Sequence, residues 1–130
     1  MKFAILVYGP PYTYQAAHSA LHFARAVTES GHQIYRIFFY HDGVYNANAL
    51  IAPPQDETDI HAQWTTLAQE HDVELIVCIA SSLRRGILDE TEADRYEKSA
   101  GNIGKPFEIS GLGQLIDASI NADRVVTFGV

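Results

Sequence analysis

Residues 73–80, Val-Glu-Leu-Ile-Val-Cys-Ile-Ala, form a short run that is apolar apart from Glu74. Its length and its β-branched side chains predict a buried strand. Residues 81–100 follow with a helical pattern that is interrupted near Gly86. A strand that runs directly into a helix is the unit of a parallel sheet covered by helices. The segment therefore predicts an α/β fold with Cys78 near the carboxyl end of a strand.

The rest of the chain repeats this alternation of apolar runs and helical patterns. Further strands are expected at residues 3–8, 34–40, 107–110 and 124–128. Further helices are expected at residues 15–30, around 60–68 after Thr58 as a possible N-cap, and at 111–121. Residues 41–57 are expected to form a long irregular connection, and such loops are often functional. We predict a three-layer α/β/α sandwich with a mostly parallel five-stranded sheet, formed as a single domain over residues 1–130.

The composition excludes several functional classes. The chain has 130 residues, with nine Lys and Arg against sixteen Asp and Glu, which gives a net charge of −7. Direct binding of nucleic acid is not expected, because it depends on a cationic surface that neutralises phosphates. The one cysteine excludes an internal disulfide and argues against a structural zinc site. No segment resembles a membrane span or an export signal, so we expect a cytoplasmic protein with no membrane contact.

The fold brings three separate segments towards one edge of the sheet. Sites in parallel α/β sheets gather at the carboxyl ends of the strands. Residues 9–12, residues 40–43 and Cys78 each follow or end an expected strand. We therefore expect these segments to lie near one another.

Cys78 is the leading candidate for a catalytic residue. The alternative is a small buried side chain with no chemical role, since free cysteine is among the most buried residue types. The expected helix start at residues 81–83 and the charges of Arg84 and Arg85 favour a thiolate, which is the reactive form. The alternative for the two arginines is a solvated helix face paired with the acidic residues at positions 89 and 90.

Other polar residues are weaker candidates. His41 and Asp42 could assist a thiol as base or electrostatic partner, although Asp42-Gly43 is also a common turn pair. His18 and His22 have metal-ligand spacing, but Arg25 shares their face, and we predict no metal. Residues 111–113, Gly-Leu-Gly, lack the third glycine of a dinucleotide fingerprint. We predict no cofactor.

Three segments together resemble the DsrE-like sulfurtransferase family, in its TusD/DsrE branch, and the resemblance runs over nearly the whole chain. They are residues 38–46 (FFYHDGVYN), 78–90 (CIASSLRRGILDE) and 109–115 (ISGLGQL). The resemblance implies that Cys78 carries a persulfide sulfur. It also implies a heterohexamer with TusB/DsrH-like and TusC/DsrF-like subunits, a TusA-like sulfur donor and a TusE-like acceptor.

The resemblance leaves two branches of sulfur metabolism open. In the Tus branch the sulfur becomes the 2-thio group of the wobble uridine in tRNA, and in the Dsr branch it serves sulfur oxidation. We predict the Tus branch. Two functions of other classes stay open from the residues alone: a non-catalytic nucleotide- or flavin-binding module, and a cysteine hydrolase that uses His41.

Overall fold

A computed structural model describes residues 1–130. Its five strands form one sheet in the order β4-β3-β2-β1-β5, and every neighbouring pair is parallel. The strands are β1 (Lys2–Val7), β2 (Gln33–Phe39), β3 (Leu75–Cys78), β4 (Phe107–Ser110) and β5 (Arg124–Phe128). All five strands that the sequence predicts are present, and their ends lie within two residues of the predicted ones. All five carboxyl ends therefore lie at one edge of the sheet.

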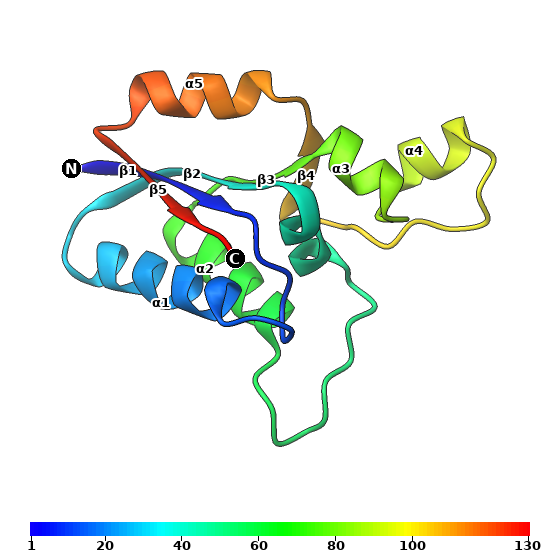
Figure 1. The fold of residues 1–130 in the computed structure, drawn as a ribbon, viewed down its shortest axis with the longest axis horizontal. Helices are drawn as coiled ribbons and strands as arrows, with labels where there is room; N and C mark the ends of the chain where they lie inside the picture. The colour runs from blue at the N-terminus through cyan, green and yellow to red at the C-terminus, as the bar shows by residue number, and fades with distance from the viewer.

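Helices cover both faces of this sheet. The α-helices are α1 (Ala16–Glu29), α2 (Ile60–His71), α3 (Ile79–Arg84), α4 (Glu90–Arg95) and α5 (Gly113–Asn121). Figure 1 shows α5 above the sheet, α1 and α2 below it, and α3 and α4 beyond one end. The predicted three-layer α/β/α sandwich is confirmed. None of the helices is both long enough and apolar enough to cross a lipid bilayer.

The two faces of the sheet pack into separate apolar clusters. The larger cluster joins the sheet to α1 and α2, and it contains Ile5, Ile37 and Val77 among its 22 buried residues. The smaller cluster lies on the α5 face and consists of Leu6, Phe38, Ile76 and Cys78. Residues that alternate along a strand point to opposite faces. Cys78 therefore shares the α5 face with Ile76, two positions earlier in β3.

The structure corrects four local predictions. The segment after β2 begins with a 3₁₀-helix, η1 (His41–Ala47), so only its later part is irregular. The N-cap of α2 is Asp59, whose carboxylate accepts from the Ala62 amide at 3.0 Å, and not Thr58. The pattern over residues 81–100 comprises two short helices that bracket Gly86, and the first begins earlier, at Ile79. Gly111 precedes α5, which begins at Gly113.

The irregular residues 48–59 form a loop that extends from the body of the molecule, as Figure 1 shows. Tyr12 connects this loop to the segment after β1. Its hydroxyl donates to the Thr58 carbonyl at 2.8 Å and accepts from the Ile60 amide at 3.2 Å. The end of the loop that leads into α2 is therefore held against the segment after β1.

Candidate functional site

Cys78 occupies the junction between a strand and a helix. It is the last residue of β3 and the N-cap of α3, in extended backbone conformation. Its side chain is 2% exposed, and it is the one cysteine in the chain. The thiol therefore lies at the carboxyl edge of the sheet, as predicted, but beneath the surface.

The pairing of the strands places a row of side chains beside this thiol. Cys78 is the register partner of Ser110 on β4, and Val77 is the partner of Phe39 on β2. Continuing this register by one residue puts Tyr40 opposite Cys78, and likewise Tyr8 opposite Tyr40. The Tyr40 amide donates to the Val7 carbonyl at 3.0 Å, so β1 and β2 stay paired at this level. Ser110, Cys78, Tyr40 and Tyr8 thus follow one another across the α5 face, about 5 Å apart from strand to strand.

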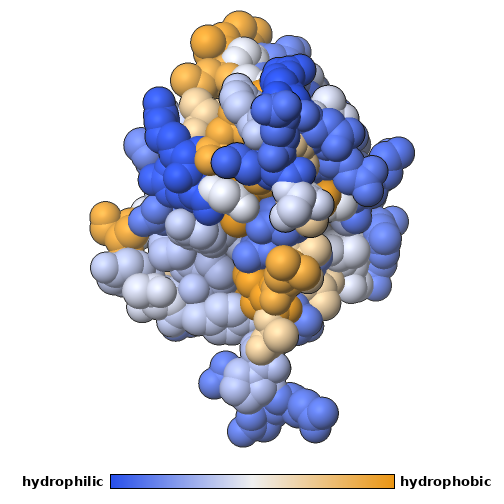
Figure 2. Space-filling model, turned by 90° about the vertical axis from the view of Figure 1, so that its right-hand side faces the viewer, coloured by the Kyte–Doolittle hydropathy of each residue, from blue (hydrophilic) through white to orange (hydrophobic).

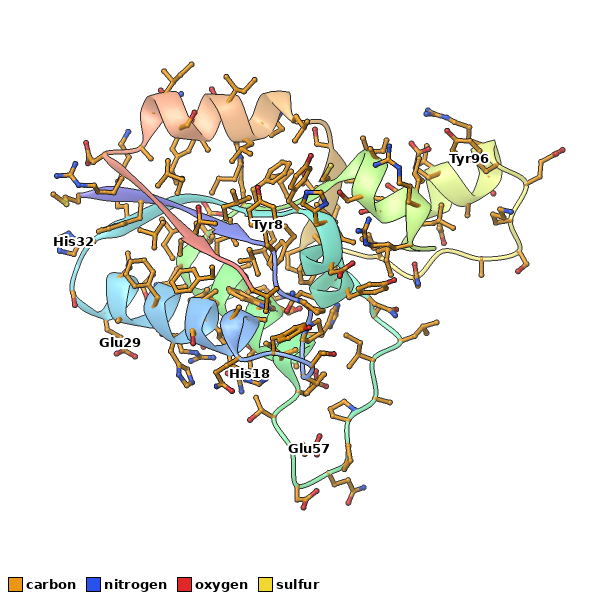
Figure 3. The ribbon with its side chains drawn as sticks, viewed as in Figure 1. Tyr8, His18, Glu29, His32, Glu57 and Tyr96 are labelled. Carbon is orange, nitrogen blue, oxygen red and sulfur yellow. The ribbon has the colours of Figure 1, made fainter.

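Two tyrosines and a histidine form an aromatic cover at this edge, and we use that name for Tyr8, Tyr40 and His41. Tyr8 and Tyr40 pack against the smaller apolar cluster that contains Cys78. Their ring centroids are 5.5 Å apart, and the His41 ring lies 5.3 Å from Tyr8 and 4.2 Å from Tyr40. Figure 3 shows Tyr8 between α5 and η1. His41 itself is exposed, so the histidine forms the outer layer of the cover.

Two polar contacts join η1 to α3 beside the cover. The Arg85 guanidinium, just past the end of α3, forms an ion pair with Asp42, with Nε 2.7 Å from Oδ1. It also donates from Nη1 to the Ser81 carbonyl at 3.1 Å. The His41 amide donates to the Ser81 hydroxyl at 3.1 Å. The predicted alternative pairing of the arginines with the acids at 89 and 90 is wrong for Arg85. The Arg84 side chain is exposed and forms no ion pair or hydrogen bond.

The other side of the smaller cluster is closed by α5, which supplies Leu115. A buried arginine holds this helix in place. The Arg36 guanidinium donates to the Gln114 carbonyl at 2.8 Å and pairs with Asp117 at 2.9 Å and Glu74 at 2.6 Å. Hydrogen bonds from the Tyr35 hydroxyl and from Arg36 lower the pKa of Asp117. The charged pair stays formed at neutral pH, and it holds α5 against the sheet.

The remaining predicted candidates lie away from Cys78 or have local structural roles. His18 lies on α1, with its ring 5.9 Å from that of Tyr12. Asp89 caps α4 by accepting from the Glu92 amide at 2.8 Å. No group of three or more His, Cys, Asp or Glu side chains converges as a metal site would require. The 111–113 segment joins β4 to the start of α5, and β4 lies on the far side of β3 from β1.

Sequence reasoning missed Tyr8 and Arg36 at this edge. It expected residues 40–43 and the helix start at 81–83 here, but it did not single out the side chains of Tyr40 and Ser81. The sequence did carry a signal for the two tyrosines. Each stands directly after the last residue of its strand, at a position whose side chain points to the same face of the sheet as Cys78. Nothing local indicated that Arg36, in the middle of an apolar strand, would hold a helix more than seventy residues later.

Comparison with known proteins then places the chain in a family. The model of the DsrE/DsrF-like family matches residues 1–128. This chain belongs to the DsrE/DsrF-like family. The DsrE protein of Allochromatium vinosum is 52% identical over 129 residues, which cover 99% of each chain. The protein named Sulfurtransferase TusD in Salmonella typhi is 50% identical over 128 residues, 98% of this chain and 100% of that protein.

A further relative, the Sulfurtransferase TusD homolog of Pseudomonas aeruginosa, is 48% identical over 129 residues, 99% of this chain and 98% of that protein. These relatives confirm the predicted family and the predicted class of enzyme, a sulfurtransferase. Among solved structures, the YchN protein of E. coli matches with a TM-score of 0.75 at 22% identity. That match covers 98% of this chain and 99% of YchN, and it supports the fold alone.

Proposed function

We propose that Cys78 accepts a persulfide sulfur from a TusA-like donor and passes it to a TusE-like acceptor, for 2-thiolation of the wobble uridine in tRNA. The observation that carries this proposal is the position of the one cysteine. It lies at the carboxyl end of β3, where parallel α/β sheets form their sites, in a chain related over its full length to sulfurtransferases.

The transfer is an exchange at sulfur. The Cys78 thiolate attacks the outer sulfur of the donor persulfide, which forms a new S–S bond at Cys78. The S–S bond within the donor breaks at the same time, and the donor cysteine leaves as a thiolate. The proton of the persulfide stays on the transferred sulfur. No electrons are gained or lost overall, so the step requires no oxidant or reductant. The reverse arrangement, with Cys78 as the leaving thiolate, delivers the sulfur to the acceptor.

This chemistry requires other proteins. Because the chain has no second cysteine, Cys78 cannot release its sulfur by forming an internal disulfide. The proposed assembly is a heterohexamer with TusB/DsrH-like and TusC/DsrF-like subunits. A surface that favours such contacts is present on α5, where Leu112, Ile116 and Ile120 are 46%, 60% and 75% exposed at successive turns. Figure 2 shows apolar side chains gathered at the top of the molecule, where α5 lies in Figure 1. Contiguous exposed apolar patches are typical of protein interfaces.

The negative charge of the chain fits this role. Because a net charge of −7 disfavours direct binding of tRNA, the protein passes sulfur to an acceptor protein and does not bind the tRNA itself. The proposed location is the cytoplasm, where thiols are kept reduced.

The test of the proposal is the content of 2-thiouridine in cellular tRNA after deletion of the gene. Complementation with the natural gene should restore thiolation, whereas the Cys78→Ser gene should not. The matched control is Ser30→Ala, at the exposed carboxyl end of α1 and away from both Cys78 and α5, which should restore thiolation as fully as the natural gene. Unchanged thiolation after deletion would contradict the role in tRNA, and would favour the DsrE-type role in sulfur oxidation instead.

A further inference from the structure

The thiol that must meet two partner proteins in turn is almost completely covered. Cys78 is 2% exposed, and the smaller cluster around it is closed by Tyr8 and Tyr40 from the sheet edge and by Leu115 from α5. A persulfide adds a sulfur atom about 2 Å beyond the thiol. Access by a partner therefore requires either the aromatic cover or α5 to move.

The aromatic cover and α5 differ in how firmly they are held. Helix α5 is held by Arg36, which is 7% exposed, forms ion pairs with two carboxylates and donates to one carbonyl. The aromatic cover, in contrast, is fastened at its outer end by the Asp42–Arg85 ion pair. The Asp42 side chain in that pair is 57% exposed and the Arg85 side chain is 22% exposed. Exposed ion pairs are weak and are screened by salt. The cover is therefore the layer that opens more easily.

The backbone of His41, where β2 leads into η1, is also unusual. His41 has a φ of 49°, in the left-handed region that residues other than glycine rarely adopt. Such a conformation persists only where neighbouring contacts hold it. The contacts here are the amide of His41 on the Ser81 hydroxyl and the ion pair of the next residue, Asp42, with Arg85. Both contacts reach α3, the helix that begins directly after Cys78.

We propose that the Asp42–Arg85 ion pair latches the aromatic cover over Cys78, and that the thiol becomes reactive towards partners when this latch opens. Asp42 and Arg85 are positioning residues in this mechanism, since they act through Tyr40 and His41 and do not touch the transferred sulfur. The role in sulfur transfer rests on the proposed function, but the control of access to the thiol does not.

The experiment measures the rate at which Cys78 reacts with iodoacetamide in the full chain, followed by intact mass. Asp42→Asn and Arg85→Gln each remove the ion pair, and each should react about 2 to 5 times faster than the unaltered chain, the upper part of the range that an exposed ion pair of ordinary strength allows. Arg85→Lys keeps the charge and should stay within about twofold of the unaltered rate.

Two controls separate a latch from general loosening. Arg95→Gln removes the Glu92–Arg95 ion pair of α4, at 3.3 Å, which lies outside the cover, and it should leave the rate within about twofold. High salt should accelerate the reaction of the unaltered chain by screening the latch, and should have less effect on Asp42→Asn. Arg85→Gln can replace Asp42→Asn in this comparison, so one folded variant is sufficient to decide the question.

Equal rates in Asp42→Asn, Arg85→Gln and the unaltered chain would overturn the proposal, and so would an equal acceleration by Arg95→Gln. Iodoacetamide requires no sulfur donor, so the result is independent of the proposed function. A chain that accepts no sulfur but reacts faster without the latch would contradict only the function. A chain that accepts sulfur and shows no effect of the latch would contradict only this inference.

Discussion

Gly43 allows η1 to sit directly against the end of β1, and replacing it with alanine should disrupt the edge that carries Cys78. A Cβ at this position would lie 2.0 Å from the Val7 carbonyl oxygen and 2.8 Å from the Val7 carbonyl carbon. Real Cβ contacts are essentially never shorter than 3.0 Å, so the two backbones would have to separate by about 1 Å. The atoms that clash belong to a strand backbone and not to a flexible side chain, so a side-chain rotation cannot relieve the clash.

Overpacking of this kind costs about 1–3 kcal/mol, and contact with backbone places Gly43→Ala at the upper end, at about 2–3 kcal/mol. For a domain of this size, each kcal/mol corresponds to a change of roughly 4 °C in the melting temperature. The variant should therefore melt about 8–12 °C below the natural chain in scanning calorimetry. Because Tyr40 is the N-cap of η1 and His41 is its first residue, Cys78 should also react faster with iodoacetamide in this variant.

Gly104→Ala is the matched control. A Cβ at Gly104 meets no atom within 4 Å, and its φ is not in the left-handed region. Alanine there should leave stability unchanged or raise it by up to about 1 kcal/mol, through the unfolded state. If Gly43→Ala melted within about 2 °C of Gly104→Ala, the close seating of η1 on β1 would be refuted.

Two further substitutions test polar groups on α2 or packed against it, on the face of the sheet opposite Cys78. Burial lowers the pKa of His61, which stacks on Phe107 at 5.1 Å, and its Nε2 has no partner. The unfolded chain then takes up a proton more readily than the folded one, so stability should fall as pH drops below about 6.5, less steeply in His61→Phe; urea unfolding with parallel curves for both chains would contradict this. Asn46 is buried, donates to Gly9 and Gly43 and accepts from Trp64 Nε1 at 3.2 Å. Asn46→Ala should lose about 2–4 kcal/mol in urea unfolding, and a loss below about 1 kcal/mol would show that these bonds matter little.

The overall architecture could be predicted because the apolar runs carry a clear signal. The run that ends at Cys78 is apolar on both faces, as a strand with helices on either side must be, and β3 buries all four of its residues. The strand position of Cys78 followed from this pattern. The placement of residues 9–12 and 40–43 near Cys78 followed from the parallel topology, which sends all carboxyl ends to one edge.

The details of the site depended on contacts that local patterns do not encode. Arg85 pairs with Asp42, 43 positions earlier in sequence, and not with the nearer acids, because η1 packs against α3. The N-cap of α2 was predicted one residue too early, at Thr58 and not at Asp59, because both residue types are favoured at this position. The burial of Cys78 under two tyrosines requires the strand register, which no single segment contains.

Whether Cys78 carries sulfur can be read from the mass of the intact chain. The protein is incubated with a cysteine desulfurase, cysteine and a TusA-like donor, and is then weighed before and after treatment with a thiol reductant. The natural chain should gain an adduct of one sulfur atom that the reductant removes, and Cys78→Ser should gain none. Absence of the adduct on the natural chain, or the same adduct on Cys78→Ser, would show that Cys78 does not carry sulfur.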